Sequence, residues 1–211
     1  ATVIGELGSA QQKEAWLSAI AGGEKLVSLA LQEGAHHAPL KSALRAERSG
    51  DEFVLNGGKV LVPDAGAADL FIVIARTSDA PGDERGLSAF LVDAATPGLT
   101  VERRSLVDSR NVGALVLEDC RVSAANLLGA PGAAWAGLSR ALDIANIGLA
   151  AELLGLATEV FERTVAYLKE RKQFGRVIGS FQGLQHRAAE LFAELELARS
   201  IVLQALHAID D

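Results

Sequence analysis

The hydrophobic periodicity of this sequence changes twice along the chain. Residues 9–21 place Trp16, Leu17 and Ile20 on one face of a short helix, with Ser9 as its N-cap and Gly22-Gly23 as its end. From about residue 25 apolar residues gather in short runs typical of strands. After the run NLLGAPGAAW, residues 126–135, a helical period begins and continues to the end. The order of elements is therefore helix, sheet, helices.

The middle segment contains seven short strand-like runs. Turn signals accompany them at Gly50-Asp51, Asn56-Gly57-Gly58, Pro81-Gly82-Asp83 and Pro97-Gly98. Because parallel strands need long crossover connections and no helical segment lies between the runs, the pattern predicts an antiparallel barrel or sandwich. The expected strands are 25–31, 42–48, 52–62, 69–78, 86–94, 99–107 and 114–122.

The last third of the chain predicts two long helices. Residues 133–171 favour one helix, and residues 181–211 favour a second with a continuous apolar stripe. Two antiparallel helices cannot cover both of their wide apolar faces, so further helices must come from chain beyond Asp211 or from a second copy. The stripe consists of Phe181, Leu184, Ala188, Leu191, Leu195, Ala198, Val202, Ala205 and Ile209.

The predicted fold class is thus α+β, with an antiparallel β-barrel or sandwich followed by long antiparallel helices of an incomplete four-helix bundle. The expected domains are 1–24, the end of a helical domain, 25–128, a β domain, and 129–211, a helical-bundle domain. A chain of 211 residues with 49% apolar and 22% charged residues is ordinary for a globular protein of this size.

Charge and composition exclude several classes. The net charge of −7 argues against nucleic-acid binding, which needs a clustered basic surface. The single cysteine, Cys120, lies in a strand pattern and favours a structural thiol in a reducing cytoplasm. We expect no membrane-spanning run. Adjacent His36 and His37 would point to opposite faces of a strand and lack metal-ligand spacing, so no metal site is predicted.

The most informative run is YLKERKQFGRVIGSFQGLQHRAAELF, residues 167–192, in which charges surround a Phe-Gly step between two predicted helices. It resembles the acyl-CoA dehydrogenase signature, R-x-Q-F-G followed by an F-Q pair and a helix. The resemblance extends back through the helix GSAQQKEAWLSAIAGGE, the hairpin SGDEFVLNGGK, the strand AADLFIVIART and the run VLEDCRVSAANLLG. It covers nearly the whole chain.

This resemblance implies a middle β domain and the first half of a C-terminal four-helix bundle, in dimers or tetramers with FAD between the β domain and the helices. It assigns FAD contacts, made across a subunit boundary, to Arg171, Gln173, Phe174, Ile178, Phe181, Gln182 and Leu184. A guanidinium suits a diphosphate, and Gly175 would allow a tight turn. The alternative from the residues alone is that Arg171 and Lys172 form a solvated helix end.

The family reaction is the α,β-dehydrogenation of an acyl-CoA thioester. In lipid metabolism it serves the oxidation of fatty acids or of sterol side chains. In the family a glutamate is the base that removes the α-proton. It usually lies on a later segment, and in some members it lies on the long helix, where this chain has Ala145. No catalytic residue can therefore be assigned. On the same helix Asp143 is the residue that the family has at this position, while Asn146 replaces an arginine that faces the CoA. Both are the expected substrate contacts.

Several flavin-site positions depart from the family pattern. Gln32 and Gly34 replace the threonine and proline of T-E-P, although Glu33 remains. Leu61 replaces a flavin-flanking tryptophan, and Pro63 replaces a threonine that bonds the flavin. Proline has neither a hydroxyl nor an N–H, so both donors are lost.

Three readings of function stay open. The first is an FAD-dependent acyl-CoA dehydrogenase that is a homo-oligomer. The second is a degenerate subunit of a heteromeric dehydrogenase, as known in the family for sterol side-chain degradation in actinobacteria, which contributes FAD contacts and assembly. The third is a non-catalytic β-sandwich binding module, which would purify colourless rather than yellow.

Overall fold

The structure is a computed structural model and describes residues 1–210. These residues form two compact units, the first from Ala1 to Ala141 and the second beginning at Leu142. The domain boundaries expected at residues 24 and 128 stay predictions.

The first unit opens with two helices, α1 (Thr2–Leu7) and α2 (Ala10–Ala21). α2 begins at Ser9, whose hydroxyl accepts from the Gln12 N–H while the Gln12 side chain accepts from the Ser9 N–H, a capping box. The Gln12 amide nitrogen also donates to the carbonyls of Ala125 and Leu127, 3.0 Å away in each case, which ties α2 to the end of the sheet. The predicted N-cap is confirmed.

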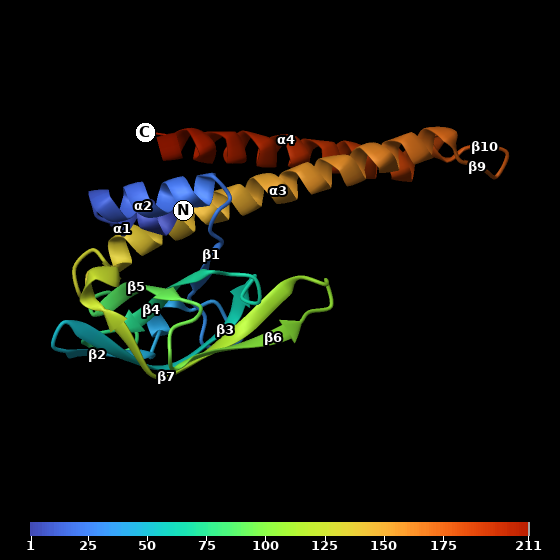
Figure 1. Ribbon diagram of the computed structural model, residues 1–211. Helices are drawn as coiled ribbons and strands as arrows, with labels where there is room; N and C mark the ends of the chain where they lie inside the picture. Colours follow the sequence, from blue (N-terminus) through green and yellow to red (C-terminus); the bar gives the residue numbers. More distant parts are fainter. Residues whose placement is uncertain (211) are drawn as a thin grey trace. The chain divides into compact units, whose positions relative to one another are not determined.

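The sheet of the first unit has eight strands in the order β6-β7-β3-β2-β4-β5-β8, with β1 attached to β4 (Figure 1). All seven predicted strands are present, and the short β8 is additional. The pairings are antiparallel except that β1 runs parallel to β4 and β2 meets β4 in one parallel pair. The strands are β1 (Val27–Ala30), β2 (Arg45–Ser49), β3 (Glu52–Pro63), β4 (Leu70–Arg76), β5 (Leu87–Asp93), β6 (Leu99–Ser105), β7 (Asn111–Ser123) and β8 (Leu127–Leu128).

The parallel pair β1–β4 differs from the purely antiparallel expectation. The two strands are separated in sequence by β2, β3 and the short 3₁₀ turn Pro39–Lys41, and this length of chain allows a return in the same direction without a crossover helix. The core lies inside the curled sheet, where side chains from β3, β4, β5 and β7 meet. Its largest fully buried members include Phe71, Phe90, Leu55, Leu115 and Leu117.

Asn56-Gly57-Gly58 does not form a turn, although its composition signals one. The three residues continue β3, and the register against β7 shifts between Leu55 and Gly57. Gly57 has φ 139°, and a Cβ there would lie 3.0–3.2 Å from Leu44, so glycine is required for close packing rather than for chain reversal.

The second unit is a helical hairpin formed by the greater part of α3 (Trp135–Glu170) and by α4 (Gln182–Asp210), which runs back alongside α3 (Figure 1). Between them lie the two-residue strands β9 (Lys172–Gln173) and β10 (Arg176–Val177) and a 3₁₀ turn, Ile178–Ser180. The predicted helices 133–171 and 181–211 thus match within two residues over the part of the chain described.

A large apolar face of the hairpin remains exposed. On α3 it includes Leu149, Leu153, Leu156 and Val160, spaced by four, three and four residues and therefore on one side of the helix; their exposed fractions are 53–62%. On α4, Leu197 and Ile201 are each 66% exposed. Two helices do not cover each other's apolar faces here, as the sequence pattern predicts.

α3 is also long and apolar enough, by length and composition, to cross a membrane, with a mean hydropathy of 1.5 over its best 18-residue window. The expectation that no run reaches this length is therefore wrong by this criterion. Core helices of soluble proteins pass the same test, because a helix rich in Ala, Gly and Leu needs few charges where it packs against others. One such helix is weak evidence for a membrane span.

Candidate functional site

The turn between β9 and β10 forms the tip of the helical hairpin. α3 ends at Glu170, and Gln173 pairs with Arg176 across a two-residue connection. The connecting residues, Phe174 and Gly175, have φ values of 54° and 77°. Positive φ at both central positions is the geometry of a type I′ hairpin turn, which favours Asn, Asp or Gly.

Phe174 is an unusual residue for the first position of such a turn. A side chain with a Cβ in the left-handed region costs roughly 1 kcal/mol, which Asn or Gly would largely avoid. Phe174 is also 90% exposed, so burial within this chain does not offset the cost. An exposed, strained aromatic residue at the end of a hairpin points to a contact outside the chain.

An aromatic and cationic cluster stands directly behind the turn. The rings of Phe174 and Phe181 meet edge to face with centroids 6.2 Å apart. The guanidinium carbon of Arg176 lies 4.1 Å from the centroid of the Phe181 ring, within the range of a cation–π contact. Phe181 is half-buried, so it gives both neighbours a fixed support.

Backbone and side-chain hydrogen bonds hold the segment that follows the turn. The Ile178 N–H donates to the Arg171 carbonyl at 2.8 Å, and the Gln185 amide donates to the Gly179 carbonyl at 3.0 Å. A Cβ at Gly179 would lie 2.7 Å from the Leu168 carbonyl oxygen, so only glycine lets this segment lie so close to the last turns of α3. The tip is therefore well anchored to both helices.

Most of the site residues predicted on the hairpin come together at this tip. Arg171, Gln173 and Gln182 are exposed, while Ile178 is half-buried. Leu184 instead lines an apolar groove of about 310 Å³ between α3 and α4, with Leu168 and Leu191 among its neighbours. Arg176 is absent from the predicted set; its only sequence signal was its place in the basic run.

The two predicted substrate contacts lie on α3. Asp143 and Asn146 are exposed and three residues apart, so they share one side of the helix. Ala145 is exposed as well, and its methyl group can neither accept nor donate a proton.

In the first unit, a buried ion pair holds the segment before β2 against β3. The Lys59 ammonium is fully buried and donates to the Glu33 carboxylate at 2.6 Å, the Ser42 hydroxyl at 2.8 Å and the Leu31 carbonyl at 3.2 Å. The Glu33 carboxylate also accepts from the N–H groups of Ala43 and Leu44. All three ammonium protons are satisfied, which a buried charge requires.

This environment changes the pKa values of both partners. Burial lowers the pKa of Lys59 to about 8, although the Glu33 charge and hydrogen bond oppose the change. Burial acts to raise the pKa of Glu33, but the Lys59 charge and the hydrogen bonds from Lys59, Ala43 and Ser42 outweigh it and lower the pKa overall. Burial and pairing thus act in opposite directions on the pKa of each partner.

β3 continues from Lys59 into a strained bulge. The register against β7 shifts between Lys59 and Val62, and Leu61, at φ 52°, is 42% exposed. The Val60 N–H donates to the Gln32 carbonyl at 2.7 Å, so the segment that carries Gln32 lies beside this bulge. Pro63 follows, and its ring leaves no N–H at that position.

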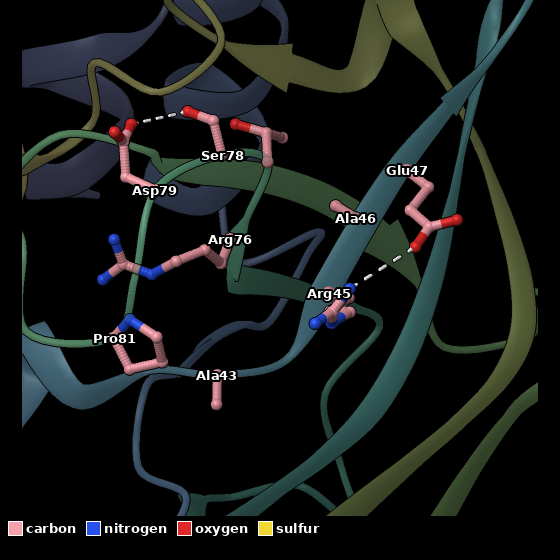
Figure 2. A pocket seen from close by; sticks show the side chains of 9 residues that line it. Ala43, Arg45, Ala46, Glu47, Arg76, Ser78, Asp79 and Pro81 are labelled. Atoms are coloured by element: carbon pink, nitrogen blue, oxygen red, sulfur yellow. Dashed lines mark hydrogen bonds and ion pairs between the residues drawn. The ribbon is translucent and has the colours of Figure 1, made fainter.

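A separate polar hollow of about 320 Å³ lies between Arg45, Arg76 and Asp79 (Figure 2). Its central cation, Arg76, is buried and donates every N–H to carbonyl oxygens of Leu40, Ser42, Asp83 and Arg85. The Ser78 hydroxyl donates a hydrogen bond to the Asp79 carboxylate, and the Arg45 guanidinium lies 3.9 Å from the Glu47 carboxylate. The Arg76 donors are used within the fold, so this arginine is structural.

Among residues 1–210, no group of three or more His, Cys, Asp or Glu side chains could hold a metal ion. Cys120 is buried and free, and burial raises the pKa of its thiol.

Two family models match most of this chain. The family model of the acyl-CoA dehydrogenase middle domain matches residues 31–120, and that of the acyl-CoA dehydrogenase C-terminal domain matches residues 132–211. The chain belongs to the acyl-CoA dehydrogenase family.

Relatives of known name agree with this assignment. The mitochondrial short/branched chain specific acyl-CoA dehydrogenase of Bos taurus is 35% identical over 212 residues, 99% of this chain and 49% of its own length. The short-chain specific acyl-CoA dehydrogenase of Clostridium acetobutylicum is 35% identical over 98% of this chain and 55% of its own length. The chain thus spans about half the length of these relatives.

The fold is also that of solved acyl-CoA dehydrogenases. The crystal structure of the enzyme from Geobacillus kaustophilus superposes with a TM-score of 0.89 at 29% identity, over 97% of this chain and 55% of the other. The α+β fold expected for this acyl-CoA dehydrogenase family member is confirmed.

Members of the family depend on FAD, and the two units fit that cofactor unequally. The hairpin tip offers Arg171 and Arg176 as exposed guanidinium groups and Phe174 as an exposed ring, which suit a diphosphate and an aromatic base. On β3, neither Leu61 nor Pro63 has a side chain that can donate a hydrogen bond, and only Leu61 has a backbone N–H. The residues of the tip therefore fit FAD, whereas the bulge on β3 has few hydrogen-bond donors to offer it.

Proposed function

We propose that this chain is a subunit of an FAD-dependent acyl-CoA dehydrogenase, an oxidoreductase that removes hydrogen from Cα and Cβ of an acyl-CoA thioester. Membership of the family supports the reaction class. The hairpin tip supports the cofactor, since it presents cationic and aromatic groups that this chain itself does not cover.

The observation that carries the proposal is the conformation of Phe174. A left-handed, 90% exposed phenylalanine is a local cost in the isolated chain, and a stacking contact with an aromatic ligand ring would offset it. In this proposal Phe174 packs against the cofactor, Arg171 pairs with its diphosphate, and Gln173, Ile178, Phe181 and Gln182 complete that side of the site. Leu184, which lines the groove between α3 and α4, is the remaining proposed contact. The ligand is held mainly by another subunit of a dimer or tetramer.

FAD supplies the electron acceptor of the family reaction when it is bound. The proposed role of this chain is to bind and orient it, while Asp143 and Asn146 contact the CoA side of the substrate through an exposed carboxylate and amide. Ala145 cannot be the base, so the proposal assigns no catalytic base to residues 1–210. The α-proton must be taken by a carboxylate elsewhere in the assembly.

Absorption spectroscopy of the purified full-length protein, with any partner that co-purifies, tests the proposal. The protein is expected to be yellow, and anaerobic addition of an acyl-CoA substrate should bleach the flavin band. A protein that stays colourless after incubation with FAD would favour the β-sandwich binding module instead.

A second candidate is a degenerate subunit that pairs with a competent acyl-CoA dehydrogenase chain. It is favoured by the bulge on β3, where neither Leu61 nor Pro63 has a side-chain donor and Pro63 has no backbone N–H, while the hairpin tip keeps its cations. Native mass spectrometry with flavin quantification separates the two candidates. Heteromers with FAD at half the number of chains support unequal subunits; homogeneous tetramers with FAD in every chain exclude them.

We further propose a cytoplasmic location, supported only by the free buried thiol of Cys120. Fractionation of the source cells would test it.

A further inference from the structure

The β9–β10 ribbon sorts the basic residues of the hairpin tip onto two faces. Gln173 is paired with Arg176, and Lys172 with Val177. Paired residues project from the same face, and consecutive residues project from opposite faces. Gln173 and Arg176 therefore share one face, and Lys172 lies on the other.

Arg171 belongs to the face that carries Arg176. The Ile178 N–H donates to the Arg171 carbonyl at 2.8 Å, which continues the antiparallel pattern by one further hydrogen-bonded pair. Arg171 is two residues before Gln173, so the alternation returns to the same side. Two guanidinium groups and one amide thus line one face of the ribbon.

The Phe181 ring orients the Arg176 guanidinium without occupying its hydrogen-bond donors. Its guanidinium stacks over the Phe181 ring, 4.1 Å from the centroid. Stacking occupies the face of the planar group and leaves its N–H donors free in the plane around its edge. Within residues 1–210, no carboxylate forms an ion pair with Arg171 or Arg176, whereas Arg163, Arg187 and Arg199 on the same hairpin are each paired with a glutamate.

We propose that Arg176, held on the Phe181 ring, is a second guanidinium that binds the diphosphate of FAD together with Arg171. This rests on the proposed function. A diphosphate carries two negative phosphate groups, and one planar guanidinium can bind only one of them with both of its parallel donors. A second guanidinium on the same face matches the other phosphate, and the Gln173 amide can donate between them.

Titration of flavin-free full-length protein with FAD, followed by flavin fluorescence, tests the proposal. Arg176→Gln should weaken FAD binding by roughly 10-fold or more, as expected for loss of a charge-assisted hydrogen bond. Lys172→Gln removes the same charge from the opposite face and is the matched control, expected to stay within about twofold of the wild type. FMN lacks the diphosphate, so its weak binding should not change in Arg176→Gln.

The variants also separate the two proposals. If Arg171→Ala weakens FAD binding while Arg176→Gln behaves like Lys172→Gln, the role of Arg176 is overturned and the FAD site stands. If none of the three variants affects binding, the FAD site itself is misplaced. An equal loss in Arg176→Gln and Lys172→Gln would mean general charge attraction and would also overturn the proposal.

Phe181→Leu gives an independent measurement that keeps every charge. It removes the ring that supports Arg176, so FAD binding should weaken, and the effect of adding Arg176→Gln on top should be smaller than in the wild type. Full additivity of the two changes would contradict a shared role. Circular dichroism of each variant establishes that the helical hairpin is retained.

Discussion

The ammonium of Lys59 lies 2.6 Å from the Glu33 carboxylate, and the lysine side chain is fully buried while the glutamate side chain is 22% exposed. This pair fixes the segment around Ser42 against the strand that continues to Leu61 and Pro63. Leu61 and Pro63 therefore follow directly on a buried lysine that is fixed by hydrogen bonds. The loss of donors there reflects residue identity and not a loosened fold.

Removing one partner of this pair should destabilise the fold more than removing both. Lys59→Met leaves the Glu33 charge partly buried without its cation, which costs on the order of 3 kcal/mol of unfolding free energy. The double variant Lys59→Met with Glu33→Gln should recover part of that loss. Chemical denaturation of the four proteins in the cycle gives the coupling, and additive effects would mean that the two groups do not interact.

Stability should fall on acidification because of Glu33. Its pKa is lower in the folded protein than the ordinary value of 4.5, so the unfolded chain takes up the proton first. The contribution of Glu33 is therefore fully present above pH about 4.5 and is lost as the pH falls through the folded pKa. The stability difference between wild type and Glu33→Gln should shrink on acid titration; a constant difference would contradict the lowered pKa.

Phe174→Asn should separate turn stability from ligand binding. Asparagine accepts the left-handed conformation, so the unfolding free energy should stay equal or rise by up to about 1 kcal/mol. FAD binding should nevertheless weaken, because the exposed ring is lost. Phe174→Leu is the control that keeps the strain and apolar bulk. If Phe174→Asn binds FAD like the wild type, the ring has no role in the site.

The sequence predicts the elements of the fold well where periodicity is strong. The N-cap at Ser9 and the long helix ending near Arg171 follow directly from residue pattern. The Asn56-Gly57-Gly58 run misleads, since the same residues that favour turns also permit the close packing of Leu44 against Gly57. The parallel pairing of β1 with β4 depends on contacts far apart in sequence, which local pattern does not encode.

In the candidate site, too, some features could be predicted from the sequence and others could not. Resemblance to the family predicts FAD contacts for Arg171 and Phe174, and these stay predictions. The stacking of Arg176 on Phe181 could not be predicted, because it depends on the register of a two-residue ribbon. The Lys59–Glu33 pair was also missed, although a lysine at an inward position of β3, in alternation with Phe53 and Leu55, is a sequence signal for a buried partner.

The FAD affinity of flavin-free full-length protein carrying Arg171→Ala tests whether the hairpin tip holds the cofactor, with Arg163→Ala on α3 as the control of equal charge. Arg171→Ala should lose at least roughly 10-fold in FAD affinity while its thermal unfolding is unchanged, and Arg163→Ala should bind like the wild type. If Arg171→Ala binds FAD with wild-type affinity, the hairpin tip does not hold the cofactor.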